Sequence, residues 1–251
     1  MEHNKSNIIY IVGIGPGDEE MMTTQAISVL DSVDVIIGYT VYLDLLGERF
    51  ANKRRLSTPM KQEIERCRLC FEEAKKGYRV AMICSGDAGV YGMAAPMYEL
   101  LESYEGDMKL DIEVVPGVTA AISGAAVLGA PINHDFCIIS LSDLLTPMEL
   151  IEKRVRAAVE GDFVIVLYNP SSRKRQDYLK RMCDIMLEAG AALDRACGYV
   201  KNIGREGLEA KTMTLEVLRD TQVDMFTTVF IGNSKTYILG DKLVTRRGYI
   251  L

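Results

Sequence analysis

Three glycine-rich segments in the first half of the sequence each follow an apolar run that is typical of a buried strand. They are residues 13–18 (GIGPGD), 85–92 (SGDAGVYG) and 115–120 (VPGVTA). Glycine lets a backbone approach a ligand closely, and open parallel sheets bind ligands beyond the carboxyl ends of their strands. Three such segments therefore predict one ligand site more strongly than any single segment does.

The first segment departs from the loop that binds dinucleotides. That loop needs a third glycine where this chain has Asp18, and an acidic residue at the end of the second strand, where this chain has Gly38. Pro16 also lacks the backbone N–H that a pyrophosphate would need. We therefore expect a ligand that requires close backbone approach but carries no phosphate. Taken alone, this loop is also consistent with a tight turn that needs glycine's backbone angles.

One carboxylate, Asp87, stands among the glycines of the second segment. It can face a cation, or accept hydrogen bonds from hydroxyl or amine groups of a ligand. The alternative is a capping residue at the start of the following helix.

Apolar runs alternate with helical patterns through the first half of the chain, which indicates βαβ units on a largely parallel sheet. We expect strands at residues 8–12, 33–37, 79–84 and 111–115, and helices at 23–30, 60–76 and 92–103. The second half restarts the alternation, with strands expected at 136–141, 163–168, 196–200 and 225–231 and helices at 147–160 and 173–189. The small residues of 117–129 predict a closely packed helix between the halves. The sequence thus predicts two α/β domains, residues 1–129 and 130–251.

The composition argues against nucleic-acid and membrane partners. The net charge of −6 offers no general basic face, although it allows a local basic pocket. We find no apolar run of the roughly 18–20 residues that span a bilayer, and the first residues are polar, so we expect a cytoplasmic protein.

The six cysteines are expected to be buried, reduced thiols, because several lie in apolar runs. Cys67 and Cys70 form a Cys-x-x-Cys pair within an expected helix, and a metal site is the alternative there. A lone pair is weak support for a metal, so we predict none.

Together with residues 167–170 (LYNP), the three glycine segments stand in the order and spacing of the tetrapyrrole methylase family, which this chain resembles over essentially its whole length. Residues 134–147 (HDFCIISLSDLLTP) and the ending Arg247-Gly248-Tyr249 resemble one branch of that family. The resemblance implies methylation of carbon 17 of a corrin precursor (precorrin-3B or cobalt-factor III), with contraction of the macrocycle, in cobalamin biosynthesis.

The resemblance further implies two α/β domains with S-adenosyl-L-methionine in a cleft between them, a tetrapyrrole substrate and a homodimer. Its cofactor contacts, carried over position by position, are Pro16, Gly86, Asp87, Ala88, Val90, Tyr91, Thr119, Ala120, Tyr168, Asn169, Met213 and Thr228.

Ring contraction requires proton transfers, for which His134 and Asp143 are the first candidates. The neighbouring Asp135, Ser140 and Ser142 are further candidates. His134 can instead be a packed or solvent-facing residue, and Asp143 can simply close a turn. The substrate carries many carboxylates, so Arg173, Lys174 and Arg175 are expected to form a cationic rim. Their alternative is the solvated start of a helix.

Four other functions stay open at this point. They are methylation of another ring carbon by a sibling enzyme, an RNA or protein methyltransferase of the same fold, a nicotinamide dehydrogenase, and a non-catalytic binding module. Residues 134–147 disfavour the first, the acidic balance disfavours RNA, and the glycine loops disfavour the third. The sequence leaves open whether the substrate already contains cobalt.

Overall fold

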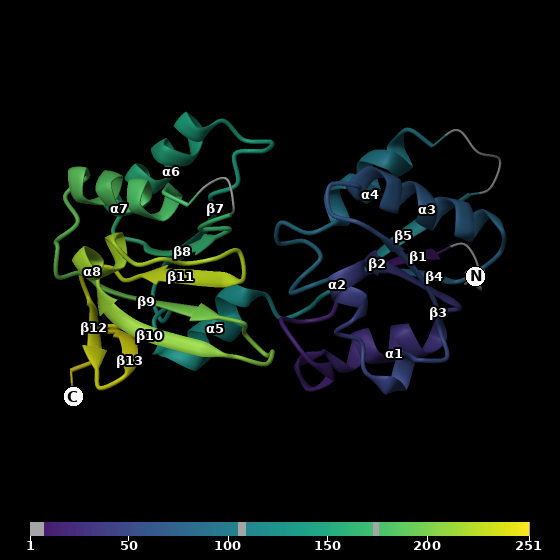
Figure 1. The fold of residues 1–251 in the computed structure, drawn as a ribbon, viewed down its shortest axis with the longest axis horizontal. Coiled ribbons are helices and arrows are strands. Elements are labelled where there is room, and N and C mark those ends of the chain that lie inside the picture. Colours follow the sequence, from purple (N-terminus) through teal and green to yellow (C-terminus); the bar gives the residue numbers. More distant parts are fainter. Residues whose placement is uncertain (1–7, 105–108, 173–175, 251) are drawn as a thin grey trace. The chain divides into compact units, whose positions relative to one another are not determined.

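The computed structural model describes residues 8–104, 109–172 and 176–250, and it divides into two compact units, Met1–Thr119 and Ala120–Leu251 (Figure 1). The division falls earlier than the boundary expected at residue 129. Helix α5 (Ala120–Leu128) explains the difference, because its residues Ala121, Ala125 and Leu128 are buried in a cluster with strand residues of the second unit.

The first unit contains a five-stranded sheet whose neighbours all run parallel, in the order β3-β2-β4-β1-β5. Four of the five strands were expected. The fifth, β3, is an edge strand of the sequence RRLST, whose mostly exposed polar residues hide the strand pattern. The strands are β1 (Ile8–Gly13), β2 (Val35–Tyr39), β3 (Arg54–Thr58), β4 (Val80–Cys84) and β5 (Asp111–Val115).

Helices cover both faces of this sheet. Side chains alternate along a strand, so Ile37 joins the core cluster under α3 and α4, whereas Ile36 joins the cluster under α1. Figure 1 shows α1 on the opposite side of the sheet from α3 and α4. The helical segments are η2 (Glu19–Met21), α1 (Thr24–Ser32), α2 (Thr40–Leu43), η3 (Glu48–Phe50), α3 (Glu63–Lys75) and α4 (Ala94–Glu102).

The second unit contains a mixed sheet in the order β10-β9-β11-β8-β7. Strands β7 and β8 are parallel, but β11 is antiparallel to both β8 and β9, and β10 is antiparallel to β9. The carboxyl ends of β7, β8 and β9 therefore share one edge of the sheet with the start of β11. The strands are β7 (Phe136–Ser140), β8 (Val164–Tyr168), β9 (Ala196–Lys201), β10 (Glu209–Thr214) and β11 (Thr227–Ile231).

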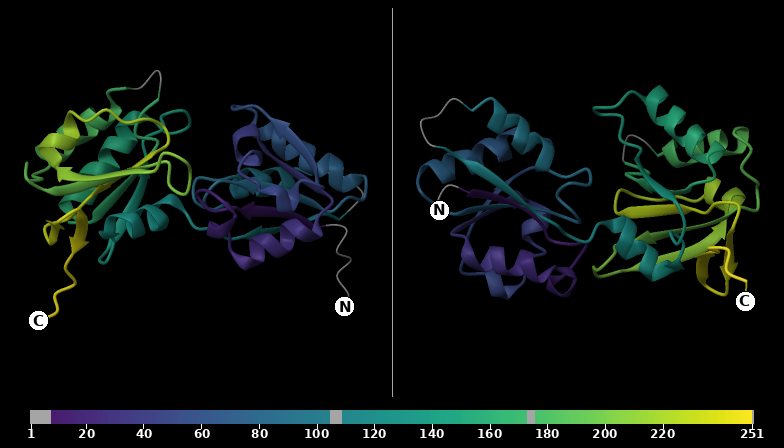
Figure 2. Two further views of the ribbon diagram at one scale, coloured as in Figure 1. Left: turned by 60° about the horizontal axis from the view of Figure 1, so that its bottom comes forward. Right: turned by 180° about the vertical axis from the view of Figure 1, so that it is seen from behind.

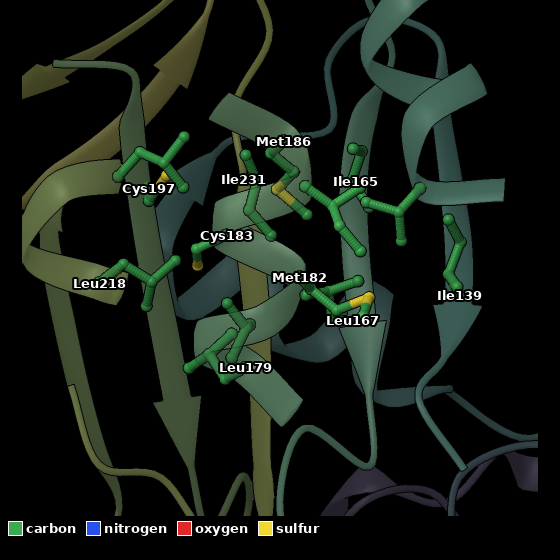
Figure 3. Packing of buried hydrophobic residues seen from close by; sticks show 14 of the residues in the cluster. Ile139, Ile165, Leu167, Leu179, Met182, Cys183, Met186, Cys197, Leu218 and Ile231 are labelled. Atoms are coloured by element: carbon green, nitrogen blue, oxygen red, sulfur yellow. The ribbon is translucent and has the colours of Figure 1, made fainter. Parts of the chain in front are cut away.

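Helices α6 (Met148–Glu160), α7 (Tyr178–Glu188) and α8 (Leu215–Arg219) cover one face of this sheet, and α5 covers the other (Figure 2). A small sheet of β12 (Thr236–Leu239), β13 (Lys242–Thr245) and β6 (Gly129–Ala130) completes the unit. A Cβ on Gly124 of α5 would lie 2.9 Å from Cζ of Phe230, which explains the small residues of this helix. On the other face, Figure 3 shows α7 side chains packed among strand side chains, including those of Met182, Cys183, Met186, Ile165, Leu167 and Ile231.

Candidate functional site

The three glycine segments meet at the carboxyl edge of the first sheet, because β4, β1 and β5 are neighbours there. Gly15 and Gly86 exchange two backbone hydrogen bonds, with N–O distances of 3.1 and 2.7 Å. A Cβ on Gly117 would lie only 2.1 Å from the carbonyl oxygen of Gly86, and one on Gly13 would lie 2.7 Å from the nitrogen of Gly117. Packing of loop against loop therefore requires these glycines, whatever the loops bind.

Asp87 joins the second segment to the third. Its Oδ1 accepts a hydrogen bond from the N–H of Gly89 (2.8 Å), and its Oδ2 accepts one from the N–H of Gly117 (2.9 Å). Asp87 does not cap the following helix, because α4 begins at Ala94 and Met93 occupies the capping position. The half-buried carboxylate thus holds the loops in place, a role that the sequence did not indicate.

The remaining first-unit candidates lie in the same loops. Pro16 and Ala88 are buried, and Val90 and Thr119 are partly buried. Tyr91 is 59% exposed and has a φ of 53°, in the left-handed region that non-glycine residues rarely adopt. Such strained residues occur preferentially at ligand-binding loops.

Tyr168 and Asn169 lie at the carboxyl end of β8 in the second unit. The hydroxyl of Tyr168 accepts a hydrogen bond from the N–H of Ala121 (2.6 Å), beside Ala120 at the start of α5. Asn169 has a φ of 54°, and its Nδ2 donates to Oγ of Ser140 at the end of β7 (2.9 Å). These contacts fix the backbone at this edge of the second sheet.

Thr228 lies at this edge, but Met213 does not. Thr228 pairs with Val200 near the carboxyl end of β9, whereas Met213 pairs with Cys197 at the start of that strand. Cys197 and Val200 lie about 10 Å apart along the strand. Met213 packs against the core cluster beneath α7, and its sulfur accepts a hydrogen bond from Thr221 (3.5 Å).

Asn202 follows β9 at the same edge, although the sequence pattern did not single it out. Like Asn169 it has a φ of 54°, and its Nδ2 donates to the carbonyl of Gly207 (3.2 Å). The sequence signal for this residue is an asparagine shortly after an expected strand and two residues before Gly204.

His134 and Asp143 lie at opposite ends of β7. Asp143 follows the carboxyl end, where its Oδ2 accepts a hydrogen bond from the hydroxyl of Tyr178 (2.7 Å). His134 precedes the strand, with its side chain 31% exposed and its Nδ1 accepting from the N–H of Asp135 (2.9 Å). The residues of β7 span about 16 Å, so the structure does not bring the two candidates together.

Arg173, Lys174 and Arg175, the expected cationic rim, lie outside the described residues.

The cysteines are free thiols, and all except the partly buried Cys137 are buried. Burial raises the pKa of Cys67 to about 11 and that of Cys70 well above its usual value, so both stay protonated at neutral pH. Within the part of the chain that the structure describes, histidine, cysteine, aspartate and glutamate form no cluster that could hold a metal ion. The helices described there are also too short or too polar to cross a membrane.

Comparisons with known proteins identify the family of this chain. The family model of Tetrapyrrole (Corrin/Porphyrin) Methylases matches residues 8–218. A probable cobalt-factor III C(17)-methyltransferase of Salmonella typhimurium is 45% identical over 97% of this chain and 100% of its own length. A precorrin-3B C(17)-methyltransferase of a Sinorhizobium species is 35% identical over 92% of this chain and 91% of its own. The crystal structure of the methyltransferase CobJ superposes with a TM-score of 0.88 at 33% identity, covering 96% of this chain and 100% of that one. This chain therefore belongs to the tetrapyrrole methylase family.

Proposed function

We propose that this protein methylates carbon 17 of a corrin precursor, with contraction of the macrocycle, in cobalamin biosynthesis in the cytoplasm. The observation that carries the proposal is the joined set of glycine loops at the carboxyl edge of the first sheet, in a chain 45% identical to a probable cobalt-factor III C(17)-methyltransferase. The greater similarity to that relative than to the precorrin-3B enzyme, which is 35% identical, favours a substrate that already contains cobalt.

S-adenosylmethionine fits the loops of the first unit. Its sulfonium group supplies an activated methyl group, and it carries no phosphate. The buried Pro16 lacks an N–H, and the loops are rich in glycine, which has no side chain to keep a ligand from the backbone, so they suit a ligand held by close backbone contact. Pro16, Gly86, Asp87, Ala88, Val90, Tyr91, Thr119 and Ala120 are the proposed contacts here. Tyr168, Asn169 and Thr228 are those of the second unit. Met213 is disfavoured, because it pairs with the start of β9 and packs against a core cluster.

Methyl transfer then depends on positioning. An electron-rich ring carbon of the substrate is the nucleophile, so no nucleophilic side chain is required. Holding the carbon, methyl group and sulfur in line can contribute on the order of 7–11 kcal/mol.

Calorimetry tests the cofactor assignment. S-adenosylmethionine and its demethylated product should bind, and NAD should not. Tighter binding of NAD would refute the assignment and favour a dehydrogenase.

Ring contraction needs a proton carrier, and we propose Asp143. Its contact with the hydroxyl of Tyr178 holds the carboxylate in one orientation at the edge that also carries Tyr168 and Asn169. His134, at the other end of β7, provides a matched comparison.

Asp143→Asn should lower the rate of contraction about 10²–10⁴-fold while sparing methylation, because only contraction needs proton transfer. The expected product is methylated at carbon 17 but uncontracted, which mass and absorption spectra reveal. His134→Ala should preserve both rates. An equal loss of both rates in Asp143→Asn would show that Asp143 positions the substrate, and a selective loss in His134→Ala would reverse the assignment.

Two further parts of the proposal concern binding and assembly. Arg173, Lys174 and Arg175 are proposed to pair with substrate carboxylates. The protein is proposed to form a homodimer, which light scattering of the purified chain tests.

A further inference from the structure

Arg66 is a buried arginine at the carboxyl edge of the first sheet. It lies on α3, is 5% exposed, and its Nη2 donates to the carbonyl of Pro59 directly after β3 (3.2 Å). Its guanidinium carbon lies 6.0 Å from the ring centre of Tyr39 at the end of β2. Its Nη1 lies 4.0 Å from the sulfur of Met93, which follows the second glycine segment. The guanidinium therefore lies at the same edge as the glycine loops.

The charge of Arg66 has no counter-ion among the described residues. The described carboxylates form no ion pair with it, and its buried Nε makes no hydrogen bond within the described part of the chain. The nearby thiols do not supply negative charge, since burial raises the pKa of Cys67 to about 11 and that of Cys84 to about 12. By contrast Glu73, buried on the same helix, pairs with Arg54 (2.7 Å) and Lys76 (2.8 Å).

A second buried polar group without a hydrogen-bond partner among the described residues lies one residue before Pro59. Thr58, the last residue of β3, is 6% exposed, and its hydroxyl makes no hydrogen bond with any described residue. Thr58 precedes Pro59, whose carbonyl binds Arg66, and it pairs in register with Tyr39, whose ring faces Arg66. Buried polar groups are almost always hydrogen-bonded, and a buried unpaired charge is costly. Two such groups on adjacent elements indicate a ligand.

We propose that Arg66 and Thr58 bind one carboxylate group of the substrate. The guanidinium provides a planar pair of N–H donors that matches a carboxylate, and the threonine hydroxyl provides a third donor. The ligand's identity rests on the proposed function, because a corrin precursor carries acetate and propionate groups. Tyr39 and Met93, which contact the guanidinium, are only partly buried, so a carboxylate reaches it by displacing side chains close to solvent.

The alternative is that Arg66 only stabilises the end of β3 through its hydrogen bond to Pro59, which we call the brace. The two roles predict opposite effects of Arg66→Met on stability and on substrate binding. Replacing an unpaired buried charge by an apolar side chain of similar length is often neutral or stabilising. A brace would instead lose stability without any change in substrate binding. Arg68→Met is the matched control, because Arg68 lies on the same helix with its side chain 61% exposed.

The test measures binding of cobalt-factor III by absorbance titration, binding of S-adenosylmethionine by calorimetry, and stability in urea. We expect Arg66→Met to bind cobalt-factor III about 10- to 100-fold more weakly, because the variant loses its hydrogen bonds to a charged group of the substrate. Arg66→Lys and Thr58→Val should lose less. All three variants should keep the wild-type affinity for S-adenosylmethionine and a normal stability, as should Arg68→Met.

The outcomes separate this proposal from the proposed function. A wild-type protein that binds S-adenosylmethionine but no corrin precursor overturns the proposed function and the ligand assigned to Arg66. A wild type that binds cobalt-factor III, together with an Arg66→Met variant that binds it equally well, overturns the Arg66 site alone. A fall in stability with unchanged substrate affinity does the same and establishes the brace.

Discussion

Replacing Asp87 tests how the glycine loops are held together. Asp87→Ala removes the acceptors of two hydrogen bonds, those from the N–H groups of Gly89 and Gly117. A hydrogen bond to a charged group contributes about 1.5–3 kcal/mol, and the half-buried position favours the lower end, so the pair contributes about 3 kcal/mol. In a protein of this length that loss lowers Tm by roughly 6–12 °C. Asp87→Asn keeps one acceptor oxygen and should lose about half as much.

Urea unfolding and calorimetry with S-adenosylmethionine provide the two readouts. Both should fall in Asp87→Ala, because release of Gly117 frees the third loop from the second. Asp18→Ala is the control, since Asp18 is an exposed carboxylate in the first loop whose side chain caps no helix. Wild-type stability in Asp87→Ala would show that the two hydrogen bonds contribute nothing, and lower stability with unchanged affinity would show that the joined loops do not bind the cofactor.

Three further perturbations follow from the contacts described. Hydrogen bonds from Lys76 and Arg54 lower the pKa of Glu73. The ionised Glu73 therefore stabilises the fold at pH values above its unfolded-state pKa near 4.5. This stabilisation is lost as the pH falls through the lowered folded-state pKa. Urea unfolding from about pH 7 to about pH 3 should show a steeper loss of stability for wild type than for Glu73→Gln, and equal slopes would contradict this. A thiol reagent should leave the buried Cys67 unmodified in the native protein at neutral pH, since burial raises its pKa to about 11, and mass spectrometry that detects modification would refute its burial. Gly117→Ala should lower the free energy of unfolding by about 1–3 kcal/mol and weaken cofactor binding, because its Cβ would lie 2.1 Å from a carbonyl oxygen. Gly47→Ala, whose Cβ would meet only a side-chain oxygen at 3.1 Å, is its control, and equal behaviour of the two variants would contradict the packing.

The fold could be predicted where hydrophobic runs are continuous. Strands β1, β4 and β8 are buried on both faces and appear as apolar runs. Strands β3 and β10 lie at sheet edges, and their polar residues give no such signal. The mixed direction of the second sheet could not be predicted either, because a strand pattern does not reveal whether its neighbour is parallel or antiparallel.

The loops of the site could be predicted from the sequence, because their glycines follow apolar strand-like runs. What holds the loops could not be predicted, since Asp87 and Gly117 are brought together only by the adjacency of β4, β1 and β5. Met213 was inferred from a short sequence match in β10, a strand that the sequence did not predict. Its position opposite the start of β9 therefore could not be predicted. Arg66 lies in a charged helical segment, where burial of one arginine leaves no trace in the pattern.

The position of the transferred methyl group tests the central proposal most directly. Purified protein is incubated with cobalt-factor III and S-adenosylmethionine labelled with ¹³C in its methyl group, and the product is assigned by NMR. We predict that the label is attached to carbon 17 of a contracted macrocycle. Label at another ring carbon, or none in the tetrapyrrole while the cofactor binds, would contradict the proposed function.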